Sequence, residues 1–235
     1  MQLALAQDTG LVSSTISAIT RHIRENELAP GAKLPSELSL SQQLGVSRTV
    51  VREAFRSLSA MRLIDLSAGK RATVATLDHG AMSLMFEHGI HTEQINIQQI
   101  YDVRRTLEVR SVTLAALRRS DQEALEILNH TKLMDEDFGN PERVMEHDIA
   151  FHLAIARASK NPVFELILSA FQNVTRHTWP ITWRTRKTEA QHHAVTQIHV
   201  SIAQAVAAGD PQLASSLMAR HFDESVHTLI SAGIA

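Results

Sequence analysis

The segment from Leu34 to Leu58 constrains the fold of this chain most strongly, because it predicts two short helices joined by a tight turn. Ser36 is placed to cap the first helix and Ser47 the second, since a serine hydroxyl accepts a hydrogen bond from the free N–H groups of a first turn. Between them, Gly45 supplies the left-handed conformation that lets the chain reverse. Apolar residues at helical spacing must face a core: Leu38, Leu40 and Leu44 on the first helix, and Val50 or Val51, Ala54, Phe55 and Leu58 on the second.

The opposite face of the second helix carries Arg48, Thr49, Arg52 and Arg56. This face suits the groove of a duplex, because arginine offers a two-pronged donor to guanine or phosphate, and hydroxyl groups and a helix N-terminus bind phosphate oxygens. The same pattern also fits an ordinary amphipathic helix pair whose charged face is only solvated.

The segment from Leu63 to Ala75 alternates apolar and polar residues on both sides of Gly69, which predicts a two-stranded hairpin with Lys70 and Arg71 at its tip. A helix, a helix-turn-helix and a basic-tipped hairpin together make a winged helix. Its recognition helix would enter the major groove, and its wing would lie near the backbone or the minor groove.

These residues resemble the GntR superfamily of bacterial transcription regulators. The resemblance rests on Leu34-Pro35-Ser36-Glu37, on Gly45-Val46-Ser47-Arg48-Thr49, on Val51-Arg52-Glu53-Ala54, and on Leu63-Ile64 before Gly69. It implies that Arg48, Thr49, Arg52 and Gly69 meet DNA. The family often has an arginine where this chain has Leu38, so we expect one contact to be missing or moved to Lys70 or Arg71. The DNA-binding residues that we predict are Ser36, Ser47, Arg48, Thr49, Arg52, Arg56, Gly69, Lys70 and Arg71.

Length and composition limit the class of protein to which this chain can belong. A length of 235 residues, with 44% hydrophobic and 20% charged residues, fits a soluble globular protein of one large or two modest domains. No run of about 18 apolar residues predicts a membrane span, and the first ten residues lack the pattern of a signal peptide, so we expect a cytoplasmic protein without a membrane partner. The absence of cysteine excludes disulfides and thiolate metal sites, so a bound metal must use nitrogen and oxygen ligands.

Charge divides the chain in two. Residues 1 to 77 hold 9 Lys and Arg against 6 Asp and Glu, whereas the remainder holds 14 against 19. The first part therefore suits an anionic partner and the second does not. We predict a flexible tail over residues 1–10, a winged helix-turn-helix domain over 11–77, a linker with a short helix over 78–92, and a helical domain over 93–235.

The spacing of apolar residues predicts helices throughout the second domain. We expect helices near residues 93–118, 121–138, 141–158, 162–178, 187–208 and 211–232. Asn-Pro pairs at 140–141 and 161–162, and Gly209-Asp210-Pro211, mark their ends and starts, since proline is tolerated in a first helical turn. The fold class is therefore mainly α, with a winged helix followed by an antiparallel helical bundle. Between 179 and 186 the chain would form a solvated loop or a lid that carries Trp179, Trp183, Arg184 and Arg186.

Four residues of this bundle form a candidate metal site. Asp148 and His152 are four apart and share one helix face. His199 and His221 each lie 11 residues from Asp210, so a helical hairpin places them at the same level, roughly 16 Å from its turn. One carboxylate and three imidazoles would bind a borderline divalent cation and leave coordination positions open. Buried histidines that only form hydrogen bonds are the alternative.

The same pattern resembles the FCD ligand-binding domain of the FadR-type branch of the GntR superfamily. The matching residues are Arg104 with Glu108, Asp148 with His152, Asn161-Pro162, His199 leading into Ala205 and Asp210, and His221. The resemblance implies that Asp148, His152, His199 and His221 hold a metal, zinc first, with nickel, cobalt or manganese as alternatives. It further implies that Arg104 lies in the pocket and that a small organic acid binds through the metal. Fatty acyl-CoA is disfavoured, because members that sense it lack this set.

These features predict a metabolite-responsive transcription regulator. One recognition helix reads few base pairs, so we expect a homodimer on a two-fold symmetric operator. A small carboxylate, bound at the metal and steadied by Arg104, would release DNA and thereby relieve repression. The alternatives are a metal-dependent hydrolase, although the chain has neither His-Glu-x-x-His nor Gly-x-Ser-x-Gly, and an architectural DNA binder with a structural metal.

Overall fold

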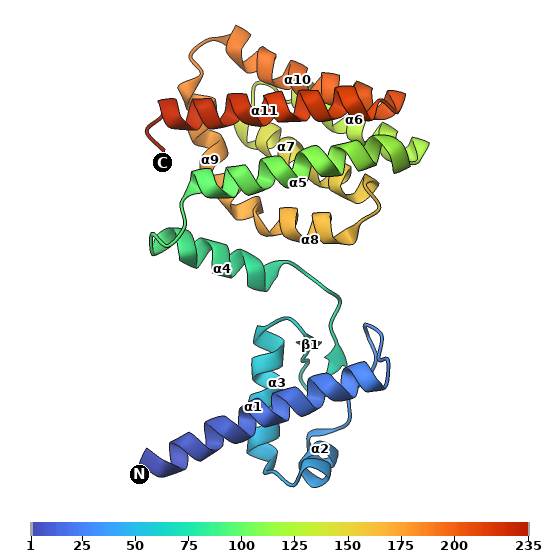
Figure 1. The fold of residues 1–235 in the computed structure, drawn as a ribbon, viewed down its shortest axis with the longest axis vertical. Coiled ribbons are helices and arrows are strands. Elements are labelled where there is room, and N and C mark those ends of the chain that lie inside the picture. The colour runs from blue at the N-terminus through green and yellow to red at the C-terminus, as the bar shows by residue number, and fades with distance from the viewer. Residues whose placement is uncertain (1, 235) are drawn as a thin grey trace. The chain divides into compact units, whose positions relative to one another are not determined.

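The computed structural model of the chain describes residues 2–234 and divides into two compact units, one up to Ala81 and one from Met82 onwards (Figure 1). The first unit contains α1 (Gln2–Glu25), α2 (Glu37–Leu44), α3 (Arg48–Ala60), β1 (Ile64–Asp65) and β2 (Thr73–Val74). Then come α4 (Gly80–His91), α5 (Ile97–Arg118), α6 (Asp121–Glu136), α7 (Pro141–Ala158), α8 (Pro162–Ala170), α9 (Gln172–Thr185), α10 (Glu189–Ala208) and α11 (Pro211–Ser231). Across residues 2–234, no helix combines the length and the apolar character that crossing a membrane requires.

The first unit is a winged helix-turn-helix, as predicted. Ser36 accepts a hydrogen bond from the backbone N–H of Ser39 at the start of α2, and Ser47 accepts one from Val50 at the start of α3. Gly45 adopts φ 66°, the left-handed conformation that the turn requires. Strands β1 and β2 pair antiparallel, with Ile64 opposite Val74. The core between these elements includes the fully buried side chains of Ile19, Leu34, Val51, Leu58 and Ile64.

Two details of the first unit differ from the sequence prediction. Helix α1 begins at Gln2, so residues 2–10 continue a helix where we predicted a tail, because the segment is rich in alanine and leucine and holds no breaker before Gly10. Leu44, also predicted to face the core, is 36% exposed at the end of α2, and Leu38 is 51% exposed. It lies two residues from the buried Leu40, about 200° around the helix, so the two cannot share a face. Met1 and Ala235, the ends of the predicted tail and second domain, lie outside the described residues.

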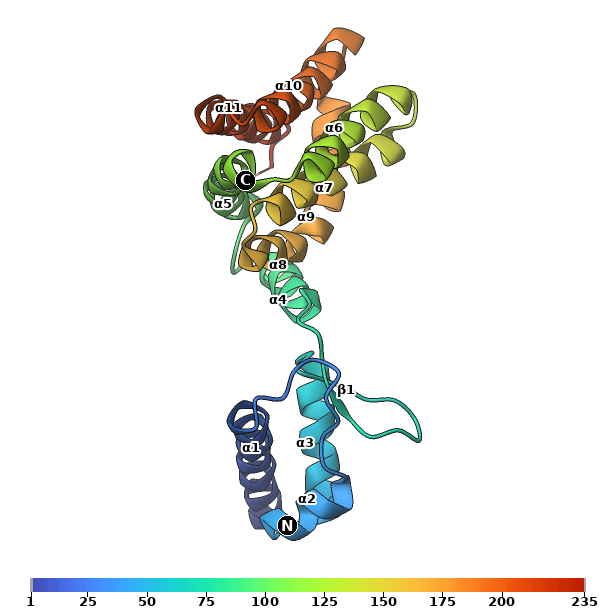
Figure 2. The same ribbon diagram turned by 90° about the vertical axis from the view of Figure 1, so that its right-hand side faces the viewer.

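The second unit is a bundle of helices, with α5 packed against α7 and α11, and α10 packed against α6 and α11 (Figure 2). Helix α11 runs back along α5 in the opposite direction (Figure 1). Asn140 and Asp210 cap α7 and α11, each followed by a first-turn proline. Gly209 ends α10 in the left-handed conformation, at φ 70°. The large side chains that fill the core are Phe151, Ile155, Ile202, Met218, Phe222 and Leu229.

The region between α7 and α10 departs from the predicted pattern. The single helix predicted over 162–178 is broken at Phe171, whose φ of −90° and ψ of −2° end α8 and start α9. Helix α9 then continues through Pro180 to Thr185, so Trp179, Trp183 and Arg184 lie on a helix and not on a loop. Packing explains the difference, because Trp179 and Trp183 stack at 4.8 Å between ring centroids and contact the core.

Helix α4 packs on the second unit through its later residues. The ring of Phe86 lies 4.6 Å from that of Phe171, and Ile90 contacts the same apolar cluster, which includes Ile100 and Leu168. The sequence left open which domain this helix would join, because its apolar residues follow no single face.

Candidate metal centre and nucleic-acid interface

Helix α3 presents a polar face with a positive charge. Arg48, Thr49, Arg52 and Arg56 are exposed, while Val51 and Phe55 on the other side are buried. The exposed Ser47 caps the N-terminus of this helix. At the wing tip, Gly69 adopts φ 70° and lies beside the exposed side chains of Lys70 and Arg71. The side chain of Ser36 is half-buried and occupied by its capping hydrogen bond.

Glu37 forms ion pairs with two of these arginines, a role that the sequence did not predict. Its carboxylate accepts hydrogen bonds from Nε and Nη2 of Arg52, at 3.3 and 3.0 Å, and lies 4.0 Å from Nη2 of Arg48. The hydrogen bond from Arg52 lowers the pKa of Glu37. Arg56 pairs instead with Glu53, one turn away on α3. Glu37 therefore orients the guanidinium of Arg52 on the exposed face of α3.

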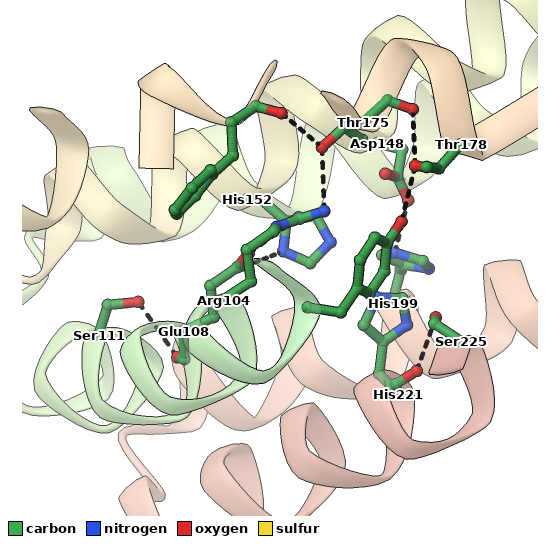
Figure 3. Close-up of polar contacts among 12 residues, drawn as sticks. Arg104, Glu108, Ser111, Asp148, His152, Thr175, Thr178, His199, His221 and Ser225 are labelled. Carbon is green, nitrogen blue, oxygen red and sulfur yellow. Dashed lines mark hydrogen bonds and ion pairs between the residues drawn. The ribbon is translucent and has the colours of Figure 1, made fainter. Parts of the chain in front are cut away.

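The three predicted histidines converge on one point inside the second unit (Figure 3). A ring nitrogen from each of His152, His199 and His221 lies within 4.8 Å of the others, and all three side chains are buried. The rings of His199 and His221 are 4.6 Å apart, as their equal distance from Asp210 along the helical hairpin predicts. Burial places the pKa of His221 well below its ordinary value, so this imidazole is neutral and its lone pair is available.

Asp148 lies beside the triad. Its Oδ1 is 2.9 Å from Nε2 of His199. Burial would raise the pKa of Asp148, but the contact with His199 outweighs burial and holds that pKa well below its usual range. The carboxylate is therefore ionised and next to three nitrogen donors.

The second nitrogens of two histidines are already engaged, which fixes the nitrogen that each can offer to a metal. Nδ1 of His199 lies 2.7 Å from the carbonyl oxygen of Val195, which can only accept, so Nδ1 carries the proton. Nε2 of His199 is buried and faces Oδ1 of Asp148. Nδ1 of His152 bonds to the carboxylate of Glu108. Such outer contacts orient metal-binding imidazoles, so the donor set fits a divalent cation.

Arg104 lies in the same network, and most of its donors are used. Nε and Nη2 donate to Oε1 of Glu108 at 3.0 and 2.8 Å, and Nη1 donates to Oγ1 of Thr175 at 2.9 Å. Burial would raise the pKa of Glu108, but charge interactions with His152 and Arg104 hold it below its ordinary value. Glu108 thus links an imidazole on α7 to a guanidinium on its own helix, α5.

A small cavity of about 30 Å³ lies against the triad. Its lining includes Arg104, Asp148, His152 and His221, and it adds Arg186, which the sequence placed only on a loop or a lid. The sequence signal for Glu108 was its position four residues after Arg104. No pattern pointed to Thr175 or Arg186 as pocket residues, because both approach the pocket through the packing of α9.

A winged helix-turn-helix followed by a helical unit with a buried histidine triad defines a class, the DNA-binding transcription regulators with a separate helical domain. Residues 11–74 match the model of the bacterial regulatory proteins of the gntR family, and residues 99–224 match that of the FCD domain. The chain therefore belongs to the GntR family and carries a C-terminal FCD domain.

Individual relatives agree with this assignment. The chain is 30% identical to the HTH-type transcriptional regulator LutR of Bacillus subtilis (strain 168), over 85% of this chain and 92% of that protein. It is 27% identical to the Galactonate operon transcriptional repressor of Escherichia coli (strain K12), over 72% and 75%. It is also 32% identical to the Glc operon transcriptional activator of the same organism, over 67% and 64%. All three are transcription regulators and not enzymes, which removes the hydrolase alternative.

A solved structure supports the fold. The Streptococcus agalactiae GntR structure has a TM-score of 0.70 and 22% identity, covering 92% of this chain and 99% of that chain. This similarity concerns the arrangement of helices and strands alone.

Proposed function

We propose that this protein is a metabolite-responsive repressor whose FCD domain binds a small organic acid at a divalent metal. The metal would be held by Asp148, His152, His199 and His221, with zinc as the first candidate. The observation that carries the proposal is the convergence of three buried imidazoles, with a ring nitrogen from each of His152, His199 and His221 within 4.8 Å of the others and Asp148 beside them. A divalent cation at this point would bind the lone pairs of the imidazoles and offset the charge of the carboxylate.

A metal in this position would act as a Lewis acid that attracts a carboxylate. Arg104 would stand beside that carboxylate with the N–H groups that Glu108 and Thr175 leave free. One relative is named for an operon of galactonate, a sugar acid, which favours an acid as effector here.

The DNA-binding surface would consist of α3 and the wing. Arg48, Thr49, Arg52 and Arg56 would enter the major groove, Ser36 and Ser47 would lie near phosphates, and Gly69, Lys70 and Arg71 would approach the backbone. Two copies of the chain would bind one two-fold symmetric operator, because a single recognition helix contacts too few base pairs for specificity. The relatives include a repressor and an activator, so the sign of the response needs a direct test.

Two substitutions separate the halves of this proposal. Arg52→Ala should weaken operator binding by about tenfold or more while metal content stays unchanged, because it removes one arginine contact to a base or phosphate. His199→Ala should lose metal while DNA binding without effector stays unchanged. Mobility-shift titration and elemental analysis of both variants would measure this, and identical effects of the two changes would contradict the division of roles.

The effector class and the sign of the response can be tested together. Adding small carboxylates to the metal-loaded protein on its operator should weaken the DNA complex, and treatment with a chelator should abolish that effect. If the metal stays bound but no acid alters DNA binding, the metal is structural and the architectural alternative is correct.

A further inference from the structure

Two guanidinium groups line the cavity beside the triad, and they differ in how many of their donors are engaged. Arg104 is buried, and three of its nitrogens donate to Glu108 and Thr175. Arg186, directly after the end of α9, donates only from Nη1 to the carbonyl oxygen of Thr182 at 3.0 Å. No carboxylate of the described residues lies within 4.0 Å of Arg186. Most of the N–H groups of Arg186 are therefore free for a ligand.

The environment of Arg186 favours an anion. Its side chain is partly buried, and burial lowers its pKa, against opposing interactions with Asp148, Glu224 and Tyr101. Arginine nevertheless stays charged in proteins, so a partly desolvated cation faces the cavity without a close partner. Such a charge gains more from a ligand anion than a fully solvated one would.

Charge balance within the pocket indicates how many charges a ligand must carry. Arg104 and Glu108 form an ion pair and cancel each other. The charges of Asp148 and Arg186, which both line the cavity, also cancel. For these groups, a divalent metal on the triad would leave two positive charges uncompensated, and Glu224, which acts on Arg186 from outside the cavity lining, offsets part of one. A ligand with two carboxylates would neutralise the remainder better than a ligand with one.

We propose that Arg186 binds a second carboxylate of the effector, so that the preferred effectors are short dicarboxylates. This inference rests on the proposed function, since the first carboxylate is the one at the metal. The cavity of about 30 Å³ holds only one or two water molecules, so even a short diacid would have to displace part of its wall. Arg186 follows α9 and is held by a single hydrogen bond, so it is the part of the wall that a ligand displaces most easily.

The test compares acids that differ by one carboxylate. Calorimetric titration of full-length, zinc-loaded protein would use succinate against butyrate and malonate against propionate. The wild type should bind each diacid about tenfold more tightly than its partner, or better, as expected for one charge-assisted contact. Arg186→Gln should reduce this preference to less than about threefold, without changing the affinity for butyrate or propionate.

Two controls make the result specific. Arg184→Gln removes an exposed arginine on the same stretch of chain and should keep the wild-type preference. Zinc content, measured in every variant, should not change. If diacids and monoacids bind the wild type equally, or if Arg186→Gln weakens both alike, the role of Arg186 is wrong, although the metal and acid proposal stands. If none of the four acids binds the zinc-loaded protein, both proposals fail.

Discussion

Glu37 connects the two helices of the DNA-binding unit through side chains, since it stands in the first turn of α2 and binds Arg52 of α3. A guanidinium held by two hydrogen bonds loses less conformational entropy on meeting a base than a free one does. Glu37 also reduces the positive charge that α3 offers to any phosphate. Specificity and general attraction to DNA thus depend on the same carboxylate in opposite ways.

Substitution of this carboxylate should separate the two effects. Glu37→Gln should raise affinity for unrelated DNA and steepen its salt dependence, while the ratio of operator to unrelated DNA affinity falls by about tenfold. Mobility shifts at several salt concentrations, on an operator selected from random DNA, would measure this. Glu53→Gln is the matched control, because Glu53 pairs with Arg56 within α3. An unchanged ratio in Glu37→Gln would show that Glu37 does not position Arg52.

Residue types alone predicted part of the candidate site. Asp148, His152, His199 and His221 could be selected because helical spacing determines which side chains share a face or a level. Arg186 could not, since its place depends on α9 continuing through Pro180, and that continuation depends on the stacking of Trp179 and Trp183. Local signals do not encode contacts of this kind.

Helix starts in the second unit are set by local chemistry, which is why most boundaries could be predicted. Ser120 and Glu123 form a capping box at the start of α6, with reciprocal hydrogen bonds between each side chain and the other backbone N–H. The break between α8 and α9 has no such signal, because Phe171 caps α9 without a side-chain hydrogen bond. It was missed for that reason.

The capping box gives α6 a dependence on pH. Hydrogen bonds from Lys160 and Ser120 lower the pKa of Glu123 to about 2, so its contribution to stability is complete above pH 4.5 and is lost as the pH falls towards 2. Glu123→Gln should therefore lower the free energy of unfolding by about 1 kcal/mol at pH 7, after allowance for solvent screening, and by less at pH 3. Urea denaturation at both pH values would measure this.

A suitable control is Glu142→Gln in the first turn of α7, whose carboxylate accepts no hydrogen bond within residues 2–234. It should show a smaller difference at pH 7. An effect of Glu123→Gln that is the same at pH 7 and pH 3 would contradict the assignment to the ionised carboxylate.

At the scale of the whole molecule, the second unit can be observed separately. Both tryptophans of the chain, Trp179 and Trp183, lie on α9, and so tryptophan fluorescence reports unfolding of the second unit alone. Circular dichroism, in contrast, reports the helices of both units. The two signals together distinguish events in the metal-binding unit from events in the DNA-binding unit.

Removal of the metal should act on one unit only. With zinc at about 1,000 times its dissociation constant, the free energy of unfolding followed by fluorescence should exceed that of the chelated protein by about 4 kcal/mol. The stability of the winged helix should not change. In His199→Ala, the chelator should not change the unfolding transition followed by fluorescence. If zinc does not change this transition in the wild type, no metal binds at the triad.

The carboxylate of Glu108 has two hydrogen-bond partners, the imidazole of His152 and the guanidinium of Arg104. A change in the contact of Glu108 with one of these groups would change its contact with the other, and such coupling is reciprocal. A metal or ligand at the triad that altered the contact of His152 with Glu108 would therefore alter the environment of α5, and a movement of α5 would alter the affinity of the triad for that metal or ligand.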